Sequence, residues 1–247
     1  AEPAAVSLLS PVAPAREASR GCREGTGDNR HVNLPRRPRV LLADDHRLVA
    51  EGLRSLLAPD FDLVGVVEDG RSLLEAARTL KPDVVVADIA MPQLNGIEAL
   101  VQLRQEGDRV PVVFLTMHRD VAYARRALDA GAAGFVLKHS APAELVTAIL
   151  AALDGKTYLT PQLAGEVLES MKEGPERAAD PVASLTPRQR QVLQLLAEGR
   201  SAKEIAVRLE ISARTVEFHK YQVMETLGLH TNAELTHFAI KHGLVEL

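Results

Sequence analysis

Between residues 39 and 155 the sequence alternates five short apolar runs with five segments of helical periodicity, and few folds accommodate that alternation. The apolar runs are RVLLAD, FDLVGVV, DVVVAD, VPVVFLT and AGFVLK. The segments between and after them, such as RLVAEGLRSLL and AELVTAILAAL, repeat apolar residues at helical spacing. Because strands that are apolar throughout must be covered on both faces, the pattern predicts a doubly wound parallel sheet between two layers of helices.

Polar residues follow four of the five apolar runs at the point where each strand should end. Asp44 and Asp45 follow the first run, Asp88 follows the third in PDVVVADIAMPQLNG, Thr116 follows the fourth and Lys138 the fifth. In an open α/β sheet, ligands bind beyond the carboxyl ends of the strands, so we expect these side chains to converge at one edge. A single aspartate there is usually a turn or helix-cap residue. The combination of these five polar residues at successive strand ends is what indicates a functional site.

Three carboxylates at one edge of a sheet repel one another unless a cation lies among them. A hard divalent ion that prefers oxygen ligands suits such a cluster, and Mg²⁺ suits it best. Lys138 and the hydroxyl of Thr116 would then be available to an anion. A carboxylate beside Mg²⁺, with a lysine and a hydroxyl nearby, is equipped for phosphoryl transfer to the carboxylate itself.

Composition narrows the class of protein. At 247 residues the chain has room for two ordinary domains and a linker. No apolar run approaches the roughly 20 residues that span a membrane, and the single Cys22 excludes an internal disulfide framework. We therefore expect a cytoplasmic protein without a membrane partner. The net charge of −4 does not by itself indicate binding to nucleic acid.

Periodicity and composition divide the chain into four parts. Residues 1–38 are rich in Ala, Pro, Gly and Arg without a sustained period, which is typical of a disordered extension. Residues 39–155 form the predicted α/β domain. In residues 156–183 we expect a connecting helix from Pro161 and then the polar linker KEGPERAADPVAS. Residues 184–247 are helical throughout.

Helix starts in the last part are marked by a Ser or Thr followed three residues later by Glu or Gln. TPRQ, SAKE and TNAE each have this capping-box form, and a fourth start is expected at Ser212. The short join EIS between the second and third helices favours a helix-turn-helix. The pattern predicts a small all-α domain of four helices.

The motifs LLADDH, DIAMPQLNGIEAL, FLTMH and GAAGFVLK occur in this order and together resemble the receiver domain of response regulators. The segment that runs from Leu185 to Val245 resembles the LuxR-type helix-turn-helix domain. With both parts, residues 39–247 are similar to the NarL/FixJ family of response regulators. The resemblance implies a flavodoxin-like (βα)5 receiver linked to a four-helix DNA-binding domain.

The resemblance also implies roles for residues at the acidic edge. It makes Asp88 the phosphoacceptor. It implies a Mg²⁺ ion held by Asp44, Asp45, Asp88 and the backbone carbonyl of Ala90. A sensor histidine kinase would supply the phosphoryl group, and the phosphorylated protein would bind double-stranded DNA as a homodimer. The protein would not be an enzyme, apart from its own phosphoryl transfer and slow autodephosphorylation.

Two residues of the implied site would sense the phosphoryl group, and a third would respond. Thr116 and Lys138 would contact the phosphoryl oxygens, and Phe135 would be the aromatic switch that reorients as Thr116 is drawn toward them. Met117 departs from the family pattern because many receivers carry a smaller residue there. Its bulk is expected to slow phosphoryl entry or hydrolysis. The neighbouring His118 reads as a solvated loop histidine rather than a catalytic base.

The third helix of the last domain is the expected recognition helix. Arg214, Glu217, Phe218 and Tyr221 fall on a face opposite its apolar stripe, and base edges in the major groove accept both polar and apolar contacts. Packing against a partner helix remains an alternative for the two aromatic residues. Glu217 is expected to accept a hydrogen bond from cytosine or to prevent binding to incorrect DNA sequences. Expected phosphate contacts are Lys203, Arg214, Thr215 and Lys220.

Three rival interpretations remain. The receiver could be a dimerisation module in a phosphorylation-independent DNA-binding regulator, against which the complete five-residue set argues. A small-ligand quorum sensor would share only the helical end, and an aromatic content of 3% argues against its pocket. An α/β enzyme is the third rival. No glycine-rich fingerprint follows the first strand, and a haloacid-type phosphatase would want a second acid where Ala90 stands.

Overall fold

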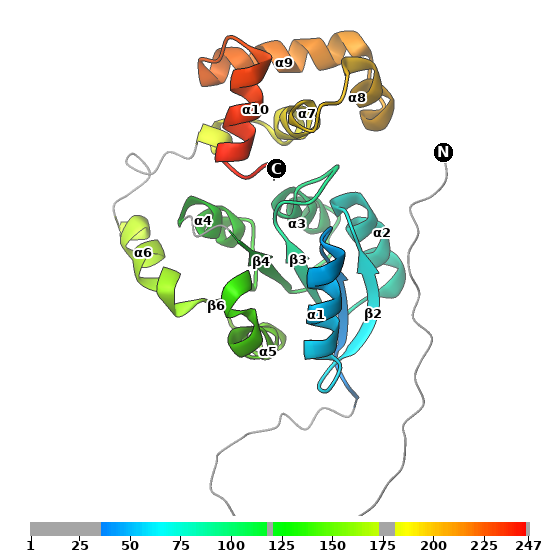
Figure 1. The fold of residues 1–247 in the computed structure, drawn as a ribbon, viewed down its shortest axis with the longest axis vertical. Helices are drawn as coiled ribbons and strands as arrows, with labels where there is room; N and C mark the ends of the chain where they lie inside the picture. Colours follow the sequence, from blue (N-terminus) through cyan, green and yellow to red (C-terminus); the bar gives the residue numbers. More distant parts are fainter. Residues whose placement is uncertain (1–35, 118–120, 173–180, 246–247) are drawn as a thin grey trace, which may run out of the picture.

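The computed structural model describes residues 36–117, 121–172 and 181–245, with side chains described to residue 169 in the second range. Residues 36–172 form a parallel sheet flanked by helices, and residues 181–245 form a separate helical domain beside it (Figure 1). The expected N-terminal extension up to residue 35, most of the expected linker, and His118 lie outside the described residues.

The sheet has six parallel strands in the order β2-β1-β3-β4-β5-β6. Their bounds are β1 Arg39–Ala43, β2 Asp62–Val67, β3 Val84–Asp88, β4 Val112–Thr116, β5 Gly134–Leu137 and β6 Tyr158–Leu159. The order reverses between β1 and β3, which is the topological switch point of a flavodoxin-like sheet. The predicted doubly wound fold is confirmed.

Five helices cover the two faces of the sheet. They are α1 Arg47–Leu57, α2 Gly70–Leu80, α3 Gly96–Gln105, α4 Val121–Asp129 and α5 Ala141–Leu153. One buried cluster joins the sheet to α2, α3 and α4, and a second joins it to α1 and α5. Because successive residues of a strand point to opposite faces, Val85 enters the first cluster and Val86 the second. This explains why β3 is apolar throughout.

The structure adds a strand that the sequence pattern did not predict. Tyr158 and Leu159 pair in parallel with Gly134 and Phe135 of β5, before the connecting helix α6, Pro161–Lys172, begins. The hydroxyl of Thr160 then accepts from the backbone N–H of Leu137 at 3.2 Å and donates to Glu144 at 2.8 Å. These contacts fasten the start of the connecting segment to the end of β5.

The helical domain comprises a short 3₁₀ turn, Pro181–Ser184, and four helices. These are α7 Pro187–Ala197, α8 Ala202–Leu209, α9 Ala213–Leu227 and α10 Asn232–Lys241. The three predicted capping boxes are present, at Thr186, Ser201 and Thr231, and Ser212 caps α9. The turn between α8 and α9 passes through Glu210, whose φ of 55° is in the left-handed region. The domain therefore contains the expected helix-turn-helix.

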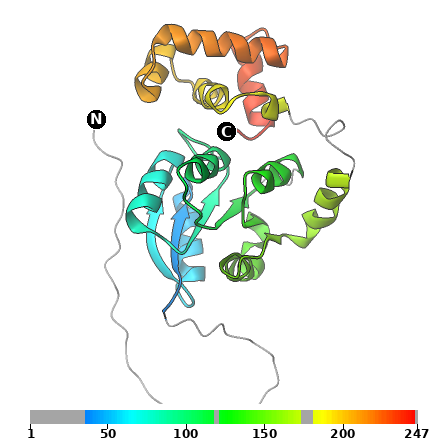
Figure 2. The same cartoon turned by 180° about the vertical axis from the view of Figure 1, so that it is seen from behind.

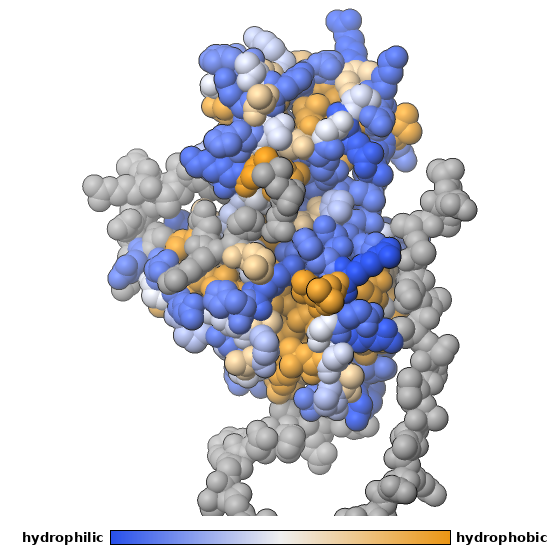
Figure 3. All heavy atoms as spheres, in the orientation of Figure 1, coloured by the Kyte–Doolittle hydropathy of each residue, from blue (hydrophilic) through white to orange (hydrophobic). Residues whose placement is uncertain are grey.

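The two domains meet through α7 and the end of α10, which face the β3–α3 loop and α4 of the receiver (Figures 1 and 2). Helix α9 lies on the far side of the helical domain in both views. The face drawn in Figure 3 is mainly hydrophilic over the helical domain, whereas apolar atoms gather over the receiver beside α1. Within the described ranges, no helix is both long and apolar enough to cross a membrane.

Candidate functional site

The carboxyl edge of the sheet brings together the acidic residues that were expected there. Asp44 follows β1 and Asp88 ends β3, and both are buried with 1% of their surface exposed. Asp44, Asp45, His46 and Asp88 each offer a ligand atom, and these atoms lie within 4.8 Å of one another. His46 is an addition that sequence reasoning missed. Its Nδ1 atom lies 2.9 Å from Asp45 Oδ1.

Lys138 occupies the centre of this cluster. Its Nζ atom lies 2.9 Å from Asp44 Oδ2 and 2.5 Å from Asp88 Oδ2. Burial alone would lower the pKa of the Lys138 ammonium, but the charges of Asp88 and Asp44 outweigh burial and raise this pKa above its usual value. The lysine is therefore positively charged and compensates two buried carboxylates. This compensation lets Asp88 stand at the end of an apolar strand.

Asp45 differs from its two acidic neighbours because it is half-buried and reaches solvent. Burial raises the pKa of its carboxyl above the usual value, and the charge of Asp44 raises it further, although His46 opposes both effects. Three carboxylates within reach of one another supply the oxygen ligands that a hard divalent ion prefers. The residues present therefore fit a metal ion of this class.

The loop from β3 to α3 begins directly at Asp88 and folds back on itself. The backbone N–H of Ile89 donates to Asp88 Oδ1 at 2.6 Å, and that of Gly96 donates to the carbonyl of Ile89 at 2.8 Å. A Cβ atom on Gly96 would lie 2.3 Å from the carbonyl oxygen of Asp88, so only glycine permits this approach. Ala90, whose carbonyl was expected to contact Mg²⁺, lies within this loop and is buried.

Thr116 and Phe135 lie on the two strands next to β3. Thr116 ends β4, is fully buried and pairs with Leu137, the residue before Lys138. Phe135 is also fully buried and belongs to the core under α4. Met117 is 62% exposed, so its bulk lies largely in solvent rather than within the acidic edge. The structure thus brings the five polar residues from four strand ends to one edge of the sheet.

Helix α9 presents the residues expected to contact DNA. Val216 and Val223 are fully buried, whereas Phe218 is 56% and Tyr221 65% exposed. Arg214 and Glu217 are exposed on the same helix, as is Lys203 on α8. This separation of an apolar stripe from an exposed aromatic and charged face is the arrangement that the sequence predicted.

Two of the other residues expected at this interface already have protein partners. The hydroxyl of Thr215 lies 2.8 Å from that of Ser212 within the cap of α9, and Lys220 Nζ lies 4.0 Å from Glu217 Oε2. The neighbouring His219 is half-buried. Partial burial and the charge of Arg188 lower the pKa of its imidazole, so it is neutral near pH 7. None of these contacts withdraws α9 from solvent.

A row of polar residues on α7 connects the two domains. Arg190 Nε donates to the buried Glu98 of α3 at 2.5 Å. Gln194 Nε2 donates to the carbonyl of Met91 at 2.8 Å, and Glu198 Oε1 accepts from the backbone N–H of Gln93 at 2.9 Å. Sequence reasoning missed this row because polar residues four apart on a helix read as a solvent-exposed face.

Two family descriptions match this chain. Residues 40–150 match the response regulator receiver domain, and residues 183–239 match the luxR family of bacterial regulatory proteins. Response regulator UvrY of Escherichia coli K12 is 35% identical over 207 residues, which cover 83% of this chain and 94% of UvrY. Transcriptional regulatory protein MctR of Rhizobium johnstonii is 39% identical over 209 residues, which cover 84% of this chain and 95% of MctR.

Solved structures of similar proteins cover both domains. An RcsB response regulator of Salmonella typhimurium, described in terms of conformational dynamism for DNA interaction, has a TM-score of 0.60 at 28% identity and covers 85% of this chain and 98% of its own. A structure of an RcsB–DNA complex has a TM-score of 0.51 at 30% identity and covers 82% of this chain and 98% of its own.

Proposed function

Because the chain belongs to the response regulators that join a receiver domain to a LuxR-type DNA-binding domain, we propose that phosphorylation of Asp88 controls when it binds DNA. The observation that carries the proposal is the position of Asp88. Its carboxylate ends β3, is buried, and lies 2.5 Å from the ammonium of Lys138. The chain is a transcription regulator and not a classical enzyme. In the proposal, residues 39–155 receive the phosphoryl group and residues 184–247 bind DNA.

Phosphorylation would proceed by attack of an Asp88 oxygen on the phosphorus of a phosphohistidine in a sensor kinase. The new P–O bond forms as the P–N bond breaks, and the imidazole leaves with the electron pair. A Mg²⁺ ion held by Asp44, Asp45, Asp88 and the carbonyl of Ala90 would neutralise the charge on the transferred group. Slow autodephosphorylation would later reset the site.

The residues around Asp88 would then rearrange. Lys138, which now pairs with Asp44 and Asp88, would donate to a phosphoryl oxygen. The hydroxyl of Thr116 would donate to another, and the movement of Thr116 would let the buried Phe135 reorient. The loop after Asp88 would also move, because the Ile89 N–H bonds to the carboxylate that is modified. This loop holds α7, so phosphorylation would weaken the contact between the two domains.

The released helical domains would form a homodimer that binds paired half-sites on double-stranded DNA in the cytoplasm. Helix α9 would enter the major groove with Glu217, Phe218 and Tyr221 near the base edges. Phosphate contacts would come from basic and hydroxyl side chains of α8 and α9, namely Lys203, Arg214, Thr215 and Lys220.

One observation favours a second candidate function. Phe218 and Tyr221 of α9 are exposed in this arrangement of the domains, so the domain contact does not cover the recognition face. In a phosphorylation-independent regulator, α9 would bind DNA in this state and the receiver would serve as a dimerisation module.

Phosphoryl incorporation tests the first proposal. The wild type and Asp88→Asn would be incubated with a small-molecule phosphodonor, with Mg²⁺ or with a chelator, and analysed by intact-protein mass spectrometry. The wild type should gain one phosphoryl group only with Mg²⁺, and Asp88→Asn should gain none. Equal incorporation by both proteins would reject Asp88 as the acceptor.

A further inference from the structure

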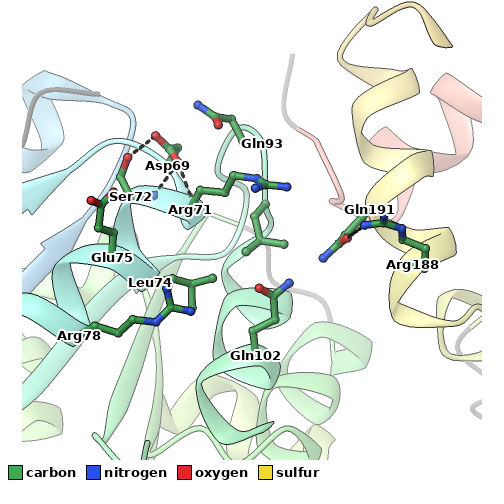
Figure 4. Close-up of a pocket in the computed structure, with 11 residues that line it drawn as sticks. Asp69, Arg71, Ser72, Leu74, Glu75, Arg78, Gln93, Gln102, Arg188 and Gln191 are labelled. Atoms are coloured by element: carbon green, nitrogen blue, oxygen red, sulfur yellow. Dashed lines mark hydrogen bonds between the residues drawn. The ribbon is translucent and has the colours of Figure 1, made fainter. Parts of the chain in front are cut away.

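A cavity of about 670 Å³ opens between the two domains, and its lining does not include Asp44, Asp45 or Asp88 (Figure 4). The receiver contributes residues of α2, of the β3–α3 loop and of α3, and the DNA-binding domain contributes α7. The side chains relevant to binding are three arginines and three glutamines: Arg71, Arg78, Gln93, Gln102, Arg188 and Gln191.

The guanidinium groups of Arg71 and Arg188 approach each other from opposite domains. Arg71 Nη2 donates to the carbonyl of Arg208 at 3.1 Å, and Arg188 Nη2 donates to the carbonyl of Leu209 at 2.6 Å. Both carbonyls belong to the last turn of α8, whose free carbonyl groups favour positive charge. The bond of Arg71 uses one nitrogen of its guanidinium, whereas Arg188 uses two, because its Nη1 also donates to Gln191 Oε1 at 3.3 Å. In the part of the chain that the structure describes, neither group forms an ion pair with a carboxylate.

Arg208, on α8, adds a further positive charge beside Arg71. Arg208 Nη1 is buried and has no hydrogen-bond partner among the described residues. Partial burial lowers the pKa of the Arg71 guanidinium, and the charges of Arg208 and Arg188 lower it further, whereas the charges of Asp69 and Glu210 oppose these effects. The domain contact therefore places Arg71 beside two like charges of the DNA-binding domain.

Asp69 offsets part of the charge of Arg71, but both of its carboxylate oxygens already accept hydrogen bonds. Asp69 caps α2, where its Oδ1 accepts from two backbone N–H groups and its Oδ2 accepts from the Ser72 hydroxyl. Glu75 lies with Asp69 at the end of the cavity farther from Arg188 (Figure 4). Arg78 forms a two-fold hydrogen bond with Glu106, which does not itself line the cavity. An anion bound between Arg71 and Arg188 would be attracted by the positive charges of these two guanidinium groups.

We propose that this cavity binds a small molecule that carries phosphate groups, held between Arg71 of the receiver and Arg188 of the DNA-binding domain. The planar fork of arginine matches phosphate oxygens, and a multiply charged group fits several guanidiniums better than a single carboxylate does. The side-chain amides of Gln102 and Gln191 offer donors and acceptors to the rest of the molecule. The cavity volume lies in the range of ordinary ligand pockets.

Occupancy of the cavity would have a regulatory consequence, because its walls come from both domains. A ligand that bridges them binds only when the domains are in contact, so it stabilises that contact by mass action. Phosphorylation of Asp88 is proposed to loosen the same contact. Ligand binding in the cavity would thus oppose the effect of Asp88 phosphorylation on the DNA-binding domain.

Isothermal titration calorimetry with inorganic pyrophosphate, and separately with a nucleoside triphosphate, tests the proposal. A chelator in the buffer removes divalent ions and so prevents anion binding at the acidic edge. The variants are Arg71→Gln and Arg188→Gln. Arg54→Gln on α1 is the matched control, because it makes the same charge change away from the cavity. Phosphorylation of Asp88 is measured in parallel and should be retained in all variants.

The wild type and Arg54→Gln should bind at least one of the two probes saturably at one site. Each cavity variant should bind on the order of ten-fold more weakly, as expected for loss of a charge-assisted hydrogen bond. Equal affinity for both probes would show that the phosphate groups suffice, and tighter binding of the triphosphate would show that the cavity also reads the nucleoside. Absence of saturable heat for both probes, or unchanged affinity in the two cavity variants, would overturn the proposal.

Discussion

Gln194 of α7 and Asn95 of the β3–α3 loop are joined by a 2.9 Å hydrogen bond, in which the backbone N–H of Asn95 donates to Gln194 Oε1. The other end of the same amide donates to the carbonyl of Met91. One side chain of the DNA-binding domain therefore holds two points of the loop that begins at Asp88. Gln194 is 1% exposed, although it would face water if the domains separated. This contact is the most direct physical connection between the acidic edge and α7.

Replacing Gln194 by Ala should separate the domains. The variant loses both loop hydrogen bonds and leaves the Asn95 N–H and the Met91 carbonyl without their partner, at a cost of about 1–3 kcal/mol to the contact. Small-angle X-ray scattering should show a larger radius of gyration than for the wild type. Gln105→Ala, at an exposed position that ends α3, is the control and should leave the radius unchanged. A Gln194→Ala variant as compact as the control would refute the role of Gln194.

Gly243→Ala should loosen the same interface from the end of α10. A Cβ atom there would lie 2.2 Å from the hydroxyl oxygen of Tyr123 on α4, so α10 and α4 must move apart. Gly228→Ala supplies a matched control. Gly243 has a φ of 54° and Gly228 a φ of 64°, so both substitutions cost about 1 kcal/mol of backbone strain. The two positions differ because nothing lies within 4 Å of a Cβ atom at Gly228.

Hydrogen exchange of α4 amides distinguishes the two glycine variants. Gly243→Ala should accelerate exchange in α4, because the clash acts on the interface, whereas Gly228→Ala should destabilise only the helical domain. The same exchange pattern in both variants would mean that strain, and not the contact with Tyr123, determines the effect.

Glu198 should make the domain contact depend on pH. Burial raises the pKa of its carboxyl above the usual 4.5. Glu198 therefore binds its proton more tightly when the domains are in contact than when they are separated. The resulting stabilisation of the domain contact is fully present below the usual pKa of Glu198. It is lost as the pH rises through the raised pKa. The radius of gyration should therefore increase with pH in the wild type over the mildly acidic range.

Glu198→Gln provides the comparison for this pH dependence. Its amide oxygen keeps an acceptor for the Gln93 N–H, but the side chain no longer titrates. The radius of gyration of the variant should stay small across the window in which that of the wild type increases. Parallel pH profiles for the two proteins would contradict the assignment to Glu198.

Glu217→Lys should change which DNA sites are selected. Glu217 is exposed on α9 and is proposed to accept a hydrogen bond from cytosine, so its loss should alter base preference at one position by about 1–3 kcal/mol. Glu225→Lys makes the same charge change near the end of α9 and is the control. Sequencing of DNA selected by each protein measures the outcome. A site profile in Glu217→Lys that matches the wild type would remove Glu217 from base recognition.

Much of the fold was predictable because its signals are local. The apolar runs of β1 and β3 predict buried parallel strands, and the rule that ligands bind at the carboxyl edge predicts the meeting of Asp44, Asp88 and Lys138. The capping boxes mark helix starts, since each needs only residues three positions apart. Strand β6 was missed because two residues are too few to show a period.

The contact between the domains could not be predicted from the same signals. Arg190, Gln194 and Glu198 repeat every four residues, as solvated positions on a helix do. Only the fold shows that they meet Glu98, Asn95 and Gln93 in another domain. The arginines around the cavity escape detection for the same reason, because Arg71 and Arg188 are far apart in sequence and each reads as an ordinary surface residue.

Phosphorylation of Asp88 is proposed to set the affinity for DNA, and a binding isotherm measures that affinity. Sites would first be selected from random duplex DNA. Fluorescence anisotropy would then give the Kd of the wild type and of Asp88→Ala, each with and without a small phosphodonor and Mg²⁺. The account predicts that the donor tightens binding by the wild type and leaves Asp88→Ala unchanged. Equal affinities for both proteins in every condition would contradict it and would favour a receiver that serves only as a dimerisation module.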